Sequence, residues 1–170
     1  MANQPSVPVL FDGAFGIYRQ VDLETWNDTS TLIPFDSDLK SLGFILVGDL
    51  LCSALAQGIL RAYVHPEEHT RGLLLVGVKD GGLNVFGLFF DSQFSDGAIA
   101  TTTTSIAVKD LPDRGIHRKV CAWKNVYDLF GQHQSHLSEL KQLHGPAQPM
   151  GETLLSIAQS IDSFSLRMNE

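Results

Sequence analysis

Histidine is the residue type whose spacing in this chain most resembles a chemical site. Six histidines occur, and two pairs are close neighbours in the sequence, His65 with His69 and His133 with His136. Imidazoles three or four residues apart on one helix can share a metal ion. Pro66 places the first pair in a predicted loop, and the second pair has no third ligand at a matching spacing. The sequence therefore predicts neither a metal site nor a bound cofactor.

His133 and His136 remain candidate binding residues for a different reason. His133 belongs to the apolar stripe of a predicted helix over residues 125–143, and His136 flanks that stripe. One interpretation is that His133 is a buried, hydrogen-bonded structural residue. The alternative is that both histidines are the polar members of a ligand or substrate pocket between the sheet and the helices.

A second candidate site is a basic stretch around residues 114–119. Arg114, His117, Arg118 and Lys119 concentrate positive charge in a chain whose net charge is −7. Guanidinium groups there could bind an anionic ligand or an acidic segment of a partner through charge-assisted hydrogen bonds. The alternative is a solvated loop that balances the acidic N-terminal half. The overall negative charge repels phosphate backbones, so no nucleic-acid partner is expected.

Motifs for catalysis are weak in this sequence. It contains no Gly-x-Ser-x-Gly elbow and no glycine-rich phosphate loop, and Cys52 and Cys121 lack neighbours that would lower a thiol pKa. A triad assembled only in space leaves no such trace, so enzymatic activity stays open, although a non-enzymatic role is favoured. Two cysteines without CxxC spacing and an N-terminus without a secretory signal predict free thiols and a cytoplasmic location.

The pattern of apolar residues and turns predicts one α+β domain over residues 1–170. Short turns such as Asp96-Gly97 separate the apolar runs and join antiparallel neighbours, which predicts a meander of about five strands. The runs are residues 44–52, 58–64, 72–79, 83–94 and 98–108. A short leading helix is expected from Asp36 or Ser37 to residue 42, and two trailing helices over 125–143 and 152–168. The domain then divides into a loop-rich arm (1–35), a core (36–143) and a C-terminal helix (151–168).

Three features of the sequence bear on membrane association, on the sheet edge and on the oligomeric state. Residues 42–60 have the length of a membrane span, but Asp49 near their middle favours two buried strands or a buried helix, and no membrane partner is expected. The run of threonines at 101–104 suits a strand near an edge. The runs 72–79 and 83–94 are apolar on both faces, so the second face needs a cover, either the N-terminal arm or another subunit. A homodimer is therefore expected.

Several short motifs occur between about residues 40 and 140. They are Leu42-Gly43-Phe44, Val47-Gly48-Asp49-Leu50, Arg61-Ala62-Tyr63-Val64-His65-Pro66, Phe94-Ser95-Asp96-Gly97, Thr101-Thr102-Thr103 and the segment 129–136. In these motifs the chain resembles an uncharacterised, cyanobacterial-type family of bacterial proteins. The resemblance is one of strands and turns, and it implies a fold without an assigned activity, cofactor or partner.

These observations favour a small cytoplasmic binding or protein-interaction module without catalytic activity. Its binding surface would be the basic stretch or an exposed face of the sheet or of a helix. The alternative is a ligand-binding domain or enzyme whose pocket surrounds His133. A weaker third reading is membrane association through residues 42–60.

Overall fold

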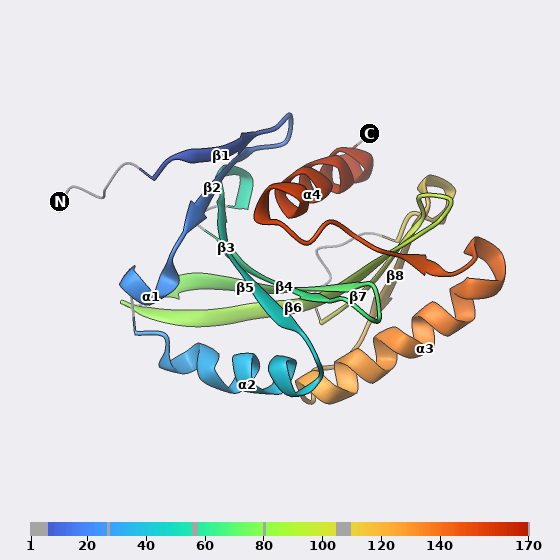
Figure 1. Cartoon of the computed structure of the whole chain (residues 1–170), viewed down its shortest axis with the longest axis horizontal. Coiled ribbons are helices and arrows are strands. Elements are labelled where there is room, and N and C mark those ends of the chain that lie inside the picture. Colours follow the sequence, from blue (N-terminus) through green and yellow to red (C-terminus); the bar gives the residue numbers. More distant parts are fainter. Residues whose placement is uncertain (1–6, 27, 56–57, 80, 105–109, 170) are drawn as a thin grey trace.

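The computed structural model describes residues 7–26, 28–55, 58–79, 81–104 and 110–169, which form one curved sheet with helices on both faces (Figure 1). The strands are β1 (Val9–Asp12), β2 (Ile17–Val21), β3 (Ile45–Cys52), β4 (Ile59–His65), β5 (Thr70–Lys79), β6 (Gly82–Phe94), β7 (Ile99–Thr103), β8 (Ile116–Val120) and β9 (Ala147–Gln148). The helices are α1 (Leu23–Trp26), α2 (Ile33–Ser41), α3 (Val126–His144) and α4 (Leu154–Asn169).

The sheet contains nine strands within the described residues, in the order β1 to β8, with β9 paired to β6. Neighbours are antiparallel except β7 and β8, which are parallel. The predicted α+β class with an antiparallel sheet is confirmed, but the five-strand meander is wrong. The five predicted strands correspond to β3–β7, and the end of the fifth run (105–108) lies outside the described residues. The other four strands have only two to five residues each, too few to show a clear alternation.

The N-terminal third of the chain is more regular than predicted. Within the predicted arm, whose residues 9–11 and 15–18 have a strand-like pattern, β1 and β2 form a hairpin that extends the sheet beside β3. Helix α2 begins at Ile33, so the predicted N-cap at Asp36 or Ser37 is wrong. Pro34 stands in the first turn of α2, where its missing N–H costs no hydrogen bond. Residues 42–60 contain the whole of β3 and the start of β4, as one of the two interpretations predicted.

Helices cover both faces of the sheet. Helices α2 and α3 lie on one face, here called the α3 face, and α4 lies on the other, the α4 face, around which the sheet curves (Figure 1). The Asp162 carboxylate accepts hydrogen bonds from the backbone N–H groups of Ala14 (3.1 Å) and Phe15 (2.8 Å), and Arg167 donates to the carbonyl oxygen of Gly97 (3.2 Å). The second apolar face is therefore covered by α4, and neither an N-terminal arm nor a second subunit is needed for it.

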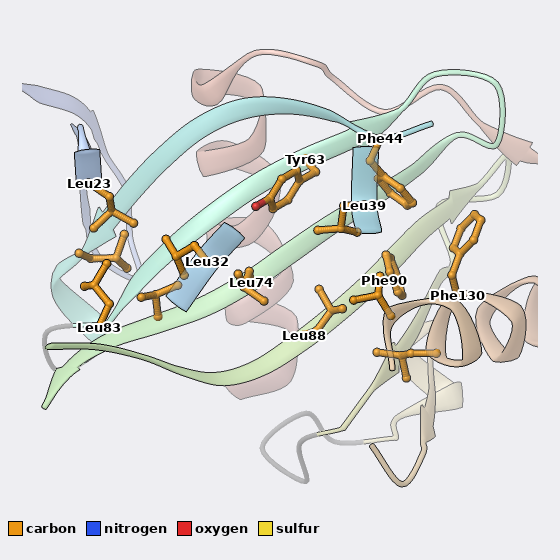
Figure 2. Close-up of a cluster of buried hydrophobic side chains, with 14 of the residues drawn as sticks. Leu23, Leu32, Leu39, Phe44, Tyr63, Leu74, Leu83, Leu88, Phe90 and Phe130 are labelled. Atoms are coloured by element: carbon orange, nitrogen blue, oxygen red, sulfur yellow. The ribbon is translucent and has the colours of Figure 1, made fainter. Parts of the chain in front are cut away.

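Most of the apolar core lies on the α3 face (Figure 2). Phe44, Phe90 and Phe130 meet there, with ring centroids 5.1 Å apart between Phe44 and Phe130 and 5.3 Å apart between Phe90 and Phe130. Each such side chain contributes about 1.5–3 kcal/mol when fully buried. On the α4 face, Gly48 packs against Leu154 with a φ of 147°, a conformation that L side chains rarely adopt, so this strand position favours glycine.

The threonines of β7 lie inside the sheet. Strand β8 pairs with β7 on the side away from β6, so β7 lies next to the edge strand, as predicted, and Thr101, Thr102 and Thr103 are all buried. Their side chains alternate between the two faces. Thr102 lies on the α3 face and Thr101 on the α4 face, a difference that matters for the polar contacts described below.

Candidate functional site

The predicted basic stretch forms part of a 3₁₀ turn and strand β8 and does not form a solvated loop. Arg114 donates to the carbonyl oxygen of Arg167 at 2.9 Å, and Lys119 lies 3.5 Å from a carboxylate oxygen of Glu139. The backbone N–H of Arg118 donates to Asp110 at 2.9 Å. These residues are joined to α3, α4 and the preceding segment, so the stretch does not present an unoccupied cluster of guanidinium groups.

His117 contacts a second histidine at the end of α3. Its ring centroid lies 4.6 Å from that of His144, whose Nδ1 is 2.7 Å from a carboxylate oxygen of Asp96. Burial lowers the pKa of His117, and His144 adds to the shift. The structure therefore joins His117 to the end of α3.

His133 and His136 belong to one chain of buried hydrogen bonds beneath α3. Nε2 of His133 lies 3.0 Å from Oγ of Ser92, and its Nδ1 lies 3.0 Å from Oγ1 of Thr102. Nδ1 of His136 lies 3.2 Å from the same threonine hydroxyl. The helical spacing of three residues thus brings both rings to one side chain of β7.

The Thr70 end of this series of hydrogen bonds determines which group donates at each step. The Thr70 hydroxyl donates to the backbone carbonyl of Glu68 (3.1 Å), so it accepts from Ser92 (2.9 Å). Ser92 then accepts the Nε2 proton of His133, whose Nδ1 accepts from the threonine of β7. Burial, aided by His136, lowers the pKa of His133 to about 3. His133 is therefore a neutral, doubly hydrogen-bonded side chain with no nitrogen free for a ligand.

A buried arginine on β4 is the centre of a charged cluster that the motifs did not indicate. Nη1 of Arg61 donates to both carboxylate oxygens of Asp49, at 3.1 and 3.0 Å. Nε and Nη2 donate to Asp36, at 3.1 and 3.2 Å, and Nη2 lies 3.6 Å from Glu24. The Tyr63 hydroxyl also accepts from Nε at 3.1 Å and donates to Asp36. The protein itself occupies all three guanidinium nitrogens, so Arg61 offers little to an anionic ligand.

The fold collects these groups from separate elements. Asp49 on β3 lies directly opposite Arg61 on β4, and Tyr63 follows two residues later on the same face of that strand. Asp36 comes from α2 and Glu24 from α1. The backbone N–H of Leu23 donates to Asp49 at 3.4 Å, which links α1 to the same carboxylate.

Burial and charge act in opposite directions on this cluster. Burial raises the pKa of Asp49, and the positive charge of Arg61 opposes that shift without cancelling it. Burial acts to lower the pKa of Arg61, but the electrostatic interactions with Asp49, Tyr63 and Asp36 together outweigh it, and the net shift is upward. Burial also raises the pKa of Tyr63, and its hydrogen bond to Asp36 adds to the shift. Arg61 thus stays cationic, and Tyr63 keeps the proton that it donates.

A pocket of about 550 Å³ opens over the cluster and is here called the Arg61 pocket. It is lined by Glu24, Asp36, Lys40, Gly43, Phe44, Ile45, Leu46, Arg61 and Tyr63. The side chains of Glu24 and Asp36 are 69% and 35% exposed, whereas that of Arg61 is 2% exposed. Lys40 is exposed as well, so two carboxylates face one ammonium group and the accessible charge of the pocket is negative by one. Such a pocket favours a cationic group that can also contact the apolar wall.

One signal in the sequence could have revealed the cluster. Asp49 and Arg61 each interrupt an apolar run, and those runs were predicted to be neighbouring strands. Buried charges are paired, so two opposite charges in adjacent buried strands predict a contact. Asp36 and Glu24 carry no comparable signal because both lie in polar surroundings of the N-terminal region.

In the part of the chain that the structure describes, no group of three or more His, Cys, Asp or Glu side chains is placed to hold a metal ion. No helix among those residues has the length and apolar character needed to cross a membrane. The chain matches no protein-family model, no curated protein and no solved structure. The resemblance to a cyanobacterial-type family stays a prediction.

Proposed function

We propose that this chain is a non-catalytic protein-interaction module that binds a cationic group of its partner in the Arg61 pocket. The observation that carries the proposal is the sign of the accessible charge. Arg61 is buried and occupied by carboxylates, whereas Glu24 and Asp36 reach solvent at the pocket and outnumber the one exposed cation there, Lys40. Exposed apolar side chains at Ile45 and Leu46 add a surface for the uncharged part of the ligand.

The site differs from both candidates in the sequence. The basic residues 114–119 are engaged within the chain, and His133 has both ring nitrogens bonded. An enzyme pocket around His133 has less support, because the neutral imidazole lacks a free nitrogen to accept or donate a substrate proton.

Calorimetric titration with octalysine and with octaglutamate at physiological ionic strength tests the proposal. Octalysine should bind, and Glu24→Gln should weaken that binding by about threefold or more because one of the two accessible carboxylates is lost. Asp113→Asn is the matched control, since it removes one negative charge from an exposed residue of the 3₁₀ turn before β8. An equal loss in both variants, or preferential binding of octaglutamate, would contradict the proposal because attraction would then be diffuse or anionic.

A cytoplasmic homodimer forms part of the same proposal. Both Cys52 and Cys121 are free thiols, which suits a reducing compartment. Exposed Phe86 and Trp123 line a second pocket of about 320 Å³ on the α3 face, an apolar surface that a second copy could cover. Native mass spectrometry of Phe86→Ser beside the wild type tests this, since a dimer that is unaffected by the substitution would place the interface elsewhere.

A further inference from the structure

The first half of β3 has a strand neighbour on one side only. Strand β2 pairs with β3 from Asp49 to Cys52, and the chain then turns into α1. Residues 45–48 therefore pair with β4 alone among the described strands. The half of β3 nearest α2 accordingly has β4 on one side and no described strand on the other. Backbone groups on such an edge can pair with an added extended segment.

This open edge is also a wall of the Arg61 pocket. Ile45 and Leu46 line the pocket and are 57% and 43% exposed. Leu46 pairs with Tyr63 and shares its face of the sheet, whereas Ile45 pairs with Val64 on the α4 face. A segment lying along the edge would therefore direct one side chain toward the pocket and its two neighbours toward the opposite face.

The edge is short and bent. A bulge at Val47 separates the pair Leu46 with Tyr63 from the pair Gly48 with Ala62. Bulges on edge strands hinder unlimited pairing between sheets. Regular strand addition is thus confined to about two or three residues, and the side chain in the pocket must contribute much of the binding free energy.

Charge argues that the occupant is not a second copy of this chain. A symmetric pair of β3 edges would bring two Arg61 pockets together, each with a net negative surface because Glu24 and Asp36 outnumber Lys40. Like charges brought together at an interface are unfavourable. A basic segment of another protein meets the opposite sign of charge.

We infer that the partner contributes an extended segment with a lysine or arginine flanked by apolar residues, which adds to β3 at Ile45 and Leu46 and places its cation in the Arg61 pocket. The inference rests on the proposed function and adds to it the conformation and the sequence pattern of the ligand. The cation lies beside Glu24 and Asp36, and the flanking apolar side chains lie toward Ile45 on the α4 face.

A selection from phage-displayed linear dodecapeptides tests the inference. The selected peptides should share an apolar, cationic, apolar triplet, and replacing the cation by norleucine should weaken binding about tenfold or more. Leu46→Lys should abolish binding, whereas Ile33→Lys, an equally drastic change at an exposed residue of α2, should not. Hydrogen exchange should slow at the backbone amides of residues 45–47 that face the open edge when peptide binds.

The possible failures are distinguishable. Peptides that bind through their cation and lose affinity in Glu24→Gln, but leave exchange at residues 45–47 unchanged, would overturn the strand addition and leave the proposed function standing. Selected peptides that bind equally to Glu24→Gln and Leu46→Lys would overturn both. Slowed exchange at residues 45–47 on concentrating the protein without peptide would identify a second copy as the occupant and overturn the inference.

Discussion

Two buried arginines on adjacent strands and opposite faces of the sheet have very different surroundings. Arg61 of β4, on the α3 face, is bonded to Asp36, Asp49 and Tyr63 through all three of its nitrogens. Arg71 of β5, on the α4 face, donates one hydrogen bond from Nη2 to Asp91, at 3.1 Å. Two arginines of similar burial thus differ in their bonding. Arg61 is the centre of a hydrogen-bond network, whereas Arg71 has a single described hydrogen bond, to Asp91.

The α4 face also leaves polar atoms without partners. Nε of Arg71, Oδ1 of Asp91 and Oγ1 of Thr101 are buried and make no hydrogen bond within the described residues. These three residues lie in register on β5, β6 and β7. An unpaired buried polar atom costs about 1–3 kcal/mol. The group around Arg61 is therefore more completely hydrogen-bonded than the group around Arg71.

The largest effect is expected from Arg61→Met. The substitution leaves the buried carboxylate of Asp49 without its counterion and should lower the free energy of unfolding by about 3–5 kcal/mol. Part of the loss should disappear at acidic pH, where Asp49 can take up a proton. Urea denaturation at two pH values measures both effects. A loss that does not depend on pH would mean that packing of the arginine stem, and not charge, dominates.

Removing a whole ion pair should separate the two faces more clearly. The double variant Arg71→Met with Asp91→Leu should be at least as stable as the wild type, with a gain of up to about 4 kcal/mol in the free energy of unfolding. The reason is that apolar contacts replace an incompletely bonded buried ion pair. The matched double variant Arg61→Met with Asp49→Leu should remain destabilised, since Tyr63 loses its donor. Thermal unfolding of both variants checks this, and an equal loss in the two would remove the proposed contrast.

Acidic pH should lower the stability of the protein through His133, the neutral buried histidine of the α3 face. His133 takes up a proton near pH 6.5 in the unfolded chain, but only near pH 3 in the folded protein. Its contribution to stability is therefore complete above about pH 6.5 and decreases below that pH. Stability should fall by about 1.4 kcal/mol per pH unit as the pH decreases between these values. Denaturation of His133→Gln over the same range should show a shallower slope. Parallel slopes in wild type and variant would contradict the assignment.

The smallest effect compares two adjacent threonines on opposite faces. Thr101→Val removes a buried hydroxyl without a described partner and should stabilise the protein by about 1 kcal/mol. Thr102→Val removes the hydroxyl that joins His133 and His136 and should destabilise it by about 1–3 kcal/mol. The two melting temperatures should therefore move in opposite directions. A loss at Thr101 would indicate that a water molecule completes the α4-face group in solution.

Local features of the sequence predicted their structures well. Asn125 was the expected N-cap of α3, and its side chain accepts a hydrogen bond from the N–H of Asp128 at 2.8 Å. Gly97 was the expected second residue of a turn, and its φ of 84° is one that glycine adopts without strain. Both signals act within a few residues, so no distant partner is needed to produce them.

Features that depend on distant partners were harder to predict. Strand β8 was interpreted as a basic loop because its own residues show no clear alternation, and it becomes a strand by pairing with β7. The Arg61 pocket draws on α1, α2, β3 and β4, and only Asp49 and Arg61 carried a readable signal. The predicted candidates Arg114, His117, Arg118, Lys119, His133 and His136 were polar residues whose partners elsewhere in the fold could not be seen.

The sequence by itself determined the apolar runs, the turns, the helical stripes and the excess of acidic groups. These follow from side-chain chemistry and from contacts between near neighbours in the chain. Only the tertiary structure decided which carboxylates meet Arg61, which face each threonine occupies and where β3 is left without a neighbour. Strand order and register are chosen by the total free energy of pairing and burial over the whole chain, and residues 25 positions apart, such as Asp36 and Arg61, meet only after that choice is made.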